Sequence, residues 1–261
     1  MKRIVSYVTI AFLLIGKFDM KCLIIAAGQG SRLRSLAEAK PLMPLKNIPL
    51  IDRVIDSAVE AGVDDFYVVV GYNGANVRAH LEEVSRSKNI PITIIENNEW
   101  KRANGISVLK AQPYLNEPFV LLMADHIFDS EIASQLIHRS SENKGIILAV
   151  DENLQNTLVD MKDVTRVLVE ENQIKKIGKG LESYNCFDTG IFLCDPVLFT
   201  AIETSSKNQQ DDSLSGGVRI LAKQGKAGAM PINGSFWCDI DDPDNFKQAD
   251  IYLSSLKEKC A

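Results

Sequence analysis

Short apolar runs alternate with amphipathic stretches between residues 20 and 150 of the chain. Five runs rich in β-branched residues are typical of buried strands, and they cover residues 22–26, 66–70, 92–95, 119–123 and 146–150. Three other stretches place apolar positions at helical spacing, at residues 49–65, 73–84 and 129–145. In the first of these, Ile51, Val54, Ile55 and Val59 share one face, and Gly62 closes the pattern. Strands that alternate with helices predict an α/β fold around a mostly parallel sheet.

The pattern changes after residue 150. Residues 166–180 predict two short strands around a Glu-Asn turn, and residues 187–195 predict a further strand with Gly190 inside it. Residues 213–232 predict a helix followed by a strand, and residues 244–259 predict a closing helix. No internal repeat or low-complexity linker separates the two halves. We therefore expect one domain over residues 20–261, in which the second half adds a mixed β layer to a Rossmann-like sheet with helices on both faces.

Residues 1–19 carry two early cations and then an apolar run over residues 4–15. This run is short for a membrane span, and no A-x-A-like cleavage site follows it. Met20 opens the stretch that contains the first predicted strand. We expect residues 1–19 to be a dispensable leader, with a membrane-associating anchor and an ordered element as the alternatives. The expected location is cytoplasmic, with membrane association left open.

Composition narrows the classes of partner. The formal net charge is -5 and no basic stripe is present, so a nucleic-acid partner is not expected. The five cysteines form no CxxC pair, which disfavours a zinc site and fits a reduced cytoplasm better than a disulfide scaffold. An anionic substrate remains compatible with this charge if a few cations gather locally.

A glycine-rich loop follows the first predicted strand. Gly28 and Gly30 let the backbone approach a phosphate, while Ser31 and Arg32 add donors and Lys40 adds a second cation. A dinucleotide fingerprint would require a third glycine at position 33, which is Leu. The loop therefore predicts binding of nucleotide phosphates; the alternative is an ordinary strand-to-helix turn with surface charges.

Two acidic segments predict a metal site. Asp125 follows a buried strand, at the sheet edge where ligands bind in α/β folds, and a carboxylate there suits Mg²⁺ held with substrate phosphates. Asp239 and Asp241 lie on the same side of an extended segment, and we expect Asp239 before Asp241 to complete the site. Turn or helix capping is the alternative for both segments. On an extended strand His126 would face away from Asp125, as a structural residue or an indirect contact.

The second half contributes a candidate site for a second phosphorylated substrate. Lys179 is a candidate cation for its phosphate, although exposed lysines on strands are usually only solvated. A few residues later, Asp188 could accept hydrogen bonds from a hydroxyl-rich ligand, and Gly190 would leave room for that ligand.

Together these segments resemble the nucleotidyltransferases that make nucleoside-diphosphate sugars and alcohols, over about residues 20–255. The resemblance is carried by "AAGQGSRL…AKPLMPL", "MADHIFD", "KGLESYNCFDTGIF" and "FWCDIDDPDNFKQA". The "DHIF" and "NGISVLKA" segments are most similar to the cytidylyltransferases that join CTP and L-myo-inositol 1-phosphate, which are often fused to a membrane-embedded synthase. The resemblance thus implies CTP and a phosphorylated polyol as substrates, functional coupling to such a synthase, and an acceptor-side location for the added β layer.

The resemblance also implies a mechanism, in which the acceptor phosphate attacks the α-phosphorus in line and pyrophosphate leaves without a general base. Arg32, Lys40 and Lys179 are the implied catalytic residues, and Mg²⁺ on Asp125 and Asp239 or Asp241 is the implied cofactor. Lys179, Asp188 and Gly190 would bind the acceptor. The implied nucleotide-binding residues are Ala26, Ala27, Gly28, Gly30, Ser31, Arg32, Lys40, Asn104, Gly105 and Ser107.

Two other functions remain open from the sequence. The same chemistry could act on a sugar-1-phosphate or on phosphocholine, for which Trp100 and Trp237 could form an aromatic cage. A non-catalytic nucleotide-binding module is the alternative of another class, and the retained cations and acidic residues disfavour it. The sequence does not indicate an oligomeric state.

Overall fold

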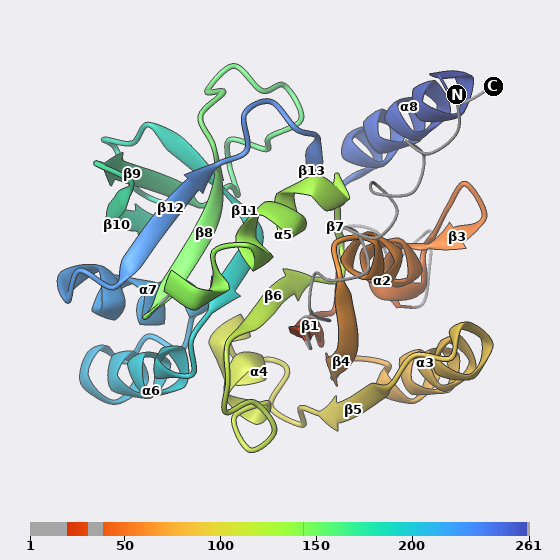
Figure 1. The fold of residues 1–261 in the computed structure, drawn as a ribbon, viewed down its shortest axis with the longest axis horizontal. Coiled ribbons are helices and arrows are strands. Elements are labelled where there is room, and N and C mark those ends of the chain that lie inside the picture. Colours follow the sequence, from red (N-terminus) through yellow and green to blue (C-terminus); the bar gives the residue numbers. More distant parts are fainter. Residues whose placement is uncertain (1–19, 31–38, 143, 260–261) are drawn as a thin grey trace, which may run out of the picture.

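The computed structural model describes residues 20–30, 39–142 and 144–259 (Figure 1). The expected leader at residues 1–19 lies outside the described residues, and so do Ser31 and Arg32 of the predicted phosphate-binding loop.

The fold is built on one nine-stranded sheet with the order β5-β4-β1-β6-β11-β8-β12-β10-β9. Strands β5, β4, β1 and β6 are parallel, β11 runs antiparallel between β6 and β8, and β12 is parallel to β8. The expected α/β fold with a mixed, mostly parallel sheet is therefore confirmed. The bounds are β1 (Met20–Ala26), β4 (Val63–Val70), β5 (Ile92–Glu96), β6 (Phe119–Met123), β8 (Ile146–Asp151), β9 (Arg166–Glu170), β10 (Gln173–Gly178), β11 (Cys186–Cys194) and β12 (Ala227–Pro231).

Helices cover both faces of the sheet, as expected. Leu23 and Ile25 of β1 pack into one core cluster while Cys22 and Ile24 pack into the other, so β1 is buried on both faces. This double burial explains why its sequence is a continuous apolar run. One face is covered by α2 (Leu50–Glu60), α3 (Gly74–Lys88) and α5 (Ser130–Ile137), and the other by α4 (Asn104–Lys110), α6 (Val197–Gln209) and α7 (Leu214–Lys223).

Several local expectations need correction. Val59 is 41% exposed, because it lies at the edge of the apolar stripe of α2 and close to the end of the helix. The stretch 129–145 forms a helix only as far as Ile137, and a short 3-10 turn follows at Ser140–Glu142. Helices α4 and α6 and the smallest strands were not predicted. The second-half hairpin is as expected, with Glu171 and Asn172 both at positive φ in its turn.

A third core cluster supports a small two-stranded ribbon beside the main sheet. Strand β7 (His126–Phe128) pairs with β13 (Trp237–Asp239), and α8 (Pro243–Lys259) packs nearby at the periphery in Figure 1. The 3-10 turn η2 (Lys40–Leu42) and the short strands β2 (Pro44–Leu45) and β3 (Ile48–Pro49) complete this region. The ribbon places the end of β13 next to the loop that follows β6.

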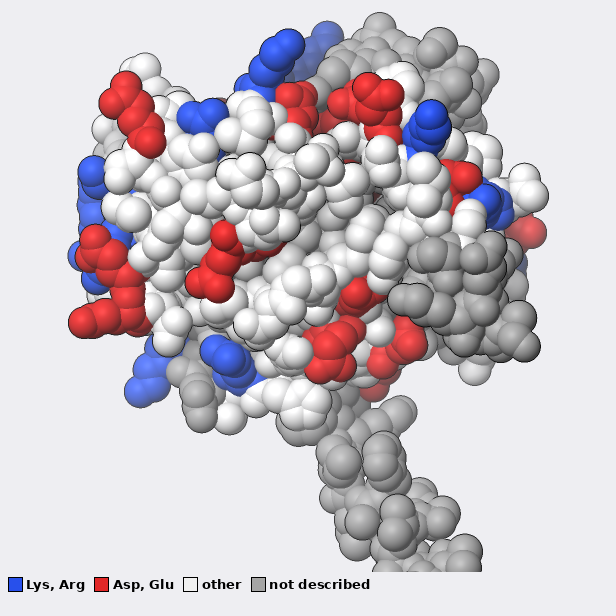
Figure 2. All heavy atoms as spheres, turned by 90° about the horizontal axis from the view of Figure 1, so that it is seen from above, with Lys and Arg blue, Asp and Glu red and all other residues white. Residues whose placement is uncertain are grey.

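Two surface properties bear on possible partners. Among the helices of the described residues, none has the length and apolar character that crossing a membrane requires. On the face shown in Figure 2, the Lys and Arg side chains of the described residues are scattered and interspersed with acidic groups.

Candidate active site

A cavity of about 340 Å³ opens at the carboxyl ends of β1 and β6. Its wall combines the glycine loop after β1, the turn after β6, strand β11 and the segment that follows β13. Ligand sites in α/β folds lie at this end of the parallel strands. The cavity is therefore the candidate active site, and it contains residues from both halves of the chain.

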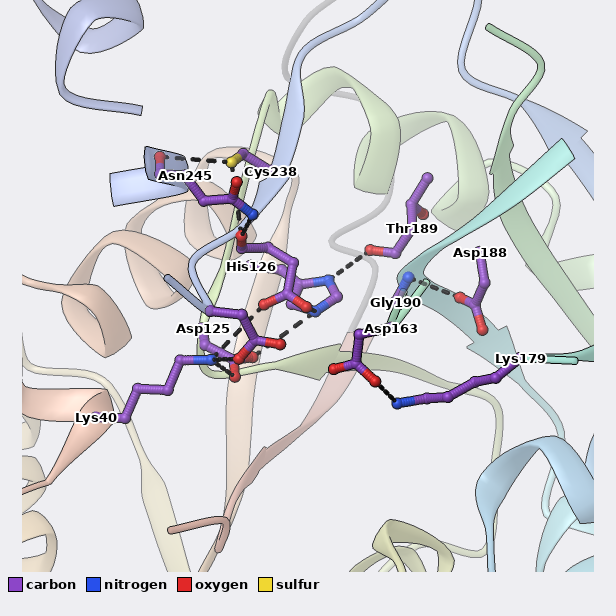
Figure 3. Close-up of polar contacts among 12 residues, drawn as sticks. Lys40, Asp125, His126, Asp163, Lys179, Asp188, Thr189, Gly190, Cys238 and Asn245 are labelled. Atoms are coloured by element: carbon purple, nitrogen blue, oxygen red, sulfur yellow. Dashed lines mark hydrogen bonds and ion pairs between the residues drawn. The ribbon is translucent and has the colours of Figure 1, made fainter. Parts of the chain in front are cut away.

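Three carboxylates converge on one buried ammonium group (Figure 3). Lys40 Nζ lies 2.5 Å from Asp125 Oδ2 and 3.7 Å from Asp239 Oδ1, and it also contacts Asp241 Oδ1. The Lys40 side chain is only 5% exposed. The backbone N–H of Ile240 donates to the carbonyl of Asp125 at 3.0 Å, which holds the two acidic segments together. The structure thus brings together the three carboxylates that the sequence proposed as metal ligands.

The charges of this cluster shift one another's pKa values. Burial opposes the charged form of Lys40, but the three carboxylates outweigh it and raise the Lys40 pKa. Burial likewise opposes ionisation of Asp239, yet His126 and Lys40 hold its pKa well below the usual range. Burial and the neighbouring Asp239 raise the pKa of Asp241. Asp239 is therefore the more strongly ionised member of the pair Asp239 and Asp241.

His126 belongs to the cluster, contrary to the expectation that it would face away. Its Nδ1–H donates to the carbonyl of Thr189 at 2.7 Å, and its Nε2 lies 3.6 Å from Asp239 Oδ2 and 3.8 Å from Asp125 Oδ1. The alternation of strand faces does not apply, because Asp125 lies in the turn between β6 and β7. Burial works against protonation, but Asp239 and Asp125 raise the His126 pKa to about 10.

The donor set fits a divalent cation. Asp125, His126 and Asp239 each carry one potential ligand atom, and these atoms lie within 4.8 Å of one another; His126 can ligate only through Nε2 and only as a neutral imidazole, so a bound cation would have to displace its proton. Asp239 Oδ1 is buried, and among the described residues it has no hydrogen-bond partner. Lys40 Nζ, 3.7 Å from this oxygen, is beyond hydrogen-bond distance, so a closer cation would stabilise the oxygen further. Asp241 lies outside this group of three and contacts Lys40.

On the nucleotide side, the structure describes most of the predicted residues. Ala26 ends β1, Ala27 is buried beside it, and Ala27 and Gly28 line the cavity. Gly30 has φ +57, and a Cβ there would lie 2.6 Å from Lys40 Cβ, so only glycine lets the loop pass this close to Lys40.

Helix α4 supplies the remaining predicted nucleotide residues. Asn104 and Ser107 line the cavity. Asn104 Oδ1 accepts from the Leu214 N–H at 3.0 Å, and Ser107 Oγ accepts from Asn97 Nδ2 at 2.9 Å. A Cβ on Gly105 would lie 2.4 Å from the carbonyl of Asp212, so this glycine allows α4 to approach the start of α7 and is not part of the cavity wall.

The three acceptor-side residues all line the same cavity, and each has a neighbour that the sequence did not reveal. The space above Gly190 is occupied by His126, since a Cβ on Gly190 would lie 2.4 Å from His126 Nδ1. Lys179 contacts Asp163 Oδ1, a residue that no sequence signal indicated. Asp188 Oδ1 accepts from the Gly190 N–H at 2.8 Å, and burial raises the Asp188 pKa to about 6.

The structure combines a mixed sheet with a glycine loop and an acidic centre at the carboxyl ends of its parallel strands, and residues 22–214 match the MobA-like NTP transferase domain. The chain belongs to this family.

The similarity to individual proteins is more specific than the family match. The chain is 32% identical to the bifunctional IPC transferase and DIPP synthase of Aquifex aeolicus, over 88% of this chain and 51% of that protein. It is 29% identical to the protein of the same name from Rubrobacter xylanophilus, over 89% and 51%. The chain therefore spans about half the length of these curated relatives. Among solved structures, the inositol-1-phosphate CTP transferase from T. maritima superposes with a TM-score of 0.80 at 28% identity, covering 93% of this chain and 98% of that one.

Proposed function

We propose that this chain is a cytidylyltransferase that converts CTP and L-myo-inositol 1-phosphate into CDP-inositol and pyrophosphate. The observation that carries the proposal is the similarity to the inositol-1-phosphate CTP transferase from T. maritima, which covers 93% of this chain with a TM-score of 0.80. In this reaction an oxygen of the acceptor phosphate forms a bond to the α-phosphorus of CTP, and the bond to the β-phosphate oxygen breaks. The attacking phosphate is already ionised near neutral pH, so the protein does not need a general base.

The protein contributes mainly by positioning charges. Asp125 and Asp239, with His126 and Asp241 beside them, are the residues that would hold Mg²⁺, which when bound neutralises and polarises phosphate oxygens. Arg32 and Lys40 are the proposed partners of the departing pyrophosphate. Because Lys40 contacts Asp125 and Asp241 in the structure, its ammonium must exchange a carboxylate for a phosphate oxygen to act in this way.

The acceptor side of the cavity, where Lys179 and Asp188 lie, favours a hydroxyl-rich acceptor over phosphocholine. Asp160, Asp163 and Asp188 contribute carboxylates to this part of the cavity. Trp100 and Trp237 both line the cavity, but Trp237 is only 5% exposed and donates its indole N–H to Asp151 at 2.9 Å, so little of its ring is open to a ligand. A cage for a quaternary ammonium group needs open aromatic faces.

Pyrophosphate release from a matrix of nucleotides and acceptors tests the proposal. The nucleotides are CTP, UTP, ATP and dTTP, and the acceptors are L-myo-inositol 1-phosphate, glucose 1-phosphate and phosphocholine. We expect the highest kcat/KM for CTP with L-myo-inositol 1-phosphate. Preference for another pair would assign the chain to another acceptor class, and the absence of turnover with every pair would favour a binding module.

The acidic centre is tested by Asp125→Asn and Asp239→Asn. Each should lower kcat at least ~10²-fold, the usual effect of losing one charge contact to the transition state. Asp244→Asn is the matched control, since Asp244 is an exposed carboxylate a few residues further on and should tolerate the change. An active Asp239→Asn enzyme together with an inactive Asp241→Asn enzyme would transfer the second ligand role to Asp241.

Lys179→Ala and Arg32→Ala test the acceptor subsite and the nucleotide subsite separately. Lys179→Ala removes a charge-assisted hydrogen bond worth about 1.5–3 kcal/mol, which should lower acceptor efficiency roughly 10- to 100-fold and leave CTP binding unchanged. Arg32→Ala should weaken CTP binding first. Calorimetric titration with CTP and Mg²⁺ would contradict this assignment if Lys179→Ala lost CTP affinity and kept its acceptor response.

A further inference from the structure

The proposed acceptor cation is already paired in the structure. Asp163 and Lys179 form an ion pair, and both side chains line the cavity that contains the acidic centre (Figure 3). A phosphate that binds Lys179 therefore meets a carboxylate at the same position. Two anions on one ammonium repel each other, so either the carboxylate moves or the phosphate binds weakly.

The chain around Asp163 fixes this pairing by backbone contacts. The N–H groups of Asp163 and Val164 both donate to the carbonyl of Asp160, at 3.0 and 2.8 Å. The N–H of Asp188 donates to the carbonyl of Thr165 at 2.9 Å, which ties the segment to β11. Asp163 thus projects from a turn that is closed by backbone hydrogen bonds and tied to β11 at its C-terminal end.

Arg166 joins this turn to the segment that carries Lys179. Its guanidinium donates to the carbonyl of Met161 from Nη2 and to the carbonyl of Leu181 from Nη1, each at 3.2 Å. The same guanidinium lies over the ring of Tyr184, with Cζ 5.0 Å from the ring centroid. The backbones on both sides of the ion pair are therefore braced, and only the two side chains need to move when a ligand enters.

Both side chains of the ion pair are in contact with solvent. The Lys179 side chain is 63% exposed and that of Asp163 is 35% exposed. Ion pairs in such contact with solvent contribute little net stability. An incoming phosphate dianion is a stronger partner for Lys179 than a carboxylate is.

We propose that Asp163 holds Lys179 until the acceptor arrives, and that the carboxylate then accepts a hydrogen bond from a hydroxyl group of the acceptor. The acceptor phosphate takes Lys179, and the released carboxylate selects phosphate esters that carry a hydroxyl group within its reach. An ester without a hydroxyl group gives the Asp163 carboxylate no hydrogen bond, and the carboxylate then only repels the phosphate. Asp163 is then a specificity-determining residue of the proposed reaction, and this inference rests on the function proposed above.

Calorimetric titration of the full chain, without nucleotide, tests the exchange with two probes. Methyl phosphate carries no hydroxyl group, and L-myo-inositol 1-phosphate is the polyol ester. In Asp163→Asn we expect methyl phosphate to bind roughly three- to tenfold more tightly, because the competing charge is gone. The advantage of the polyol ester over methyl phosphate should shrink by roughly tenfold, the effect of one hydrogen bond to a charged group.

The control is Asp56→Asn, which removes the carboxylate of an exposed ion pair with Lys88, outside the cavity wall. Asp56→Asn should leave the affinities for methyl phosphate and for L-myo-inositol 1-phosphate unchanged. Weaker binding of both probes in Asp163→Asn, as expected for Lys179→Ala, would overturn the proposal, since Asp163 would then only support the lysine. Unchanged binding of both probes would overturn it as well. Asp163→Ala repeats the test without an amide that can bond to Lys179.

Failure of the proposed function would be distinguishable. Wild-type protein that releases no pyrophosphate from CTP and L-myo-inositol 1-phosphate would refute the cytidylyltransferase assignment. The change in methyl phosphate affinity would still report whether Asp163 and an anion compete for Lys179.

Discussion

Gly190→Ala is the sharpest single test of how the site is assembled. Gly190 has φ +75, and a Cβ there would lie 2.4 Å from His126 Nδ1 and 2.5 Å from His126 Cε1. Alanine at this position therefore carries two separate costs. One is the left-handed backbone, about 1–2 kcal/mol. The other is displacement of a packed imidazole, about 1–3 kcal/mol for overpacking.

Gly225→Ala separates these two costs. Gly225 has φ +68, and a Cβ there would meet nothing within 4 Å, so the substitution carries only the backbone cost. Urea denaturation of both variants should show Gly190→Ala less stable than Gly225→Ala by about 1–3 kcal/mol. Pyrophosphate release should fall at least ~10-fold in Gly190→Ala alone, because the displaced imidazole disturbs Asp125 and Asp239. Equal stability of the two variants would refute the reasoning that Gly190 exists to admit His126.

Two further predictions concern Asp188 and Trp237. Because burial raises the pKa of Asp188 to about 6 from the ordinary 3.8, the folded state binds more protons than the unfolded state between about pH 4 and pH 6. Stability should therefore fall as the pH rises through this window, by up to about 3 kcal/mol, and Asp188→Asn should flatten that slope in urea titrations at stepped pH. Trp237→Phe removes the donor to Asp151 and should cost about 1–3 kcal/mol in the same denaturation assay, against less than about 1 kcal/mol for the half-buried Trp100→Phe. An equal loss in both tryptophan variants would show that the bond to Asp151 contributes nothing specific.

The central strands were predictable because burial on both faces leaves a continuous apolar run in the sequence. Helix α6 was not, because it contains Thr200, Thr204 and Ser205, which have weak helix propensity. Tertiary packing stabilises it instead, including the stacking of Phe199 on Phe119 with ring centroids 5.5 Å apart. The ribbon of β7 and β13 was also missed, since two three-residue strands far apart in the chain leave no local pattern.

The chemistry of the acidic centre was predictable as a set of residue types, but its pairing was not. Asp125 was proposed as a metal ligand because it follows a buried strand, and Asp239 because it lies in an acidic segment on the same side as Asp241. The position of Lys40 depends on contacts across 85 residues to Asp125 and 201 residues to Asp241, which no local pattern contains. The expectation that His126 faces away from Asp125 was wrong for a local reason. A turn at Asp125 interrupts the strand, so the alternation of side chains between the two faces does not apply there.

The pairing of charges explains how a chain with a formal net charge of -5 is suited to two anionic substrates under the proposed function. Lys40 contacts Asp125 and Asp241, His126 faces Asp239, and Lys179 contacts Asp163. Cations that are paired internally do not form an exposed basic patch, so they attract other polyanions weakly. A substrate gains binding energy only if its phosphate replaces a carboxylate and the carboxylate finds a new partner. Under the proposals made above, that partner is a metal cation for Asp125 and Asp239, and a hydroxyl group of the acceptor for Asp163. Both exchanges require the correct ligand, so the same pairs that limit affinity for simple anions provide the discrimination between phosphate esters.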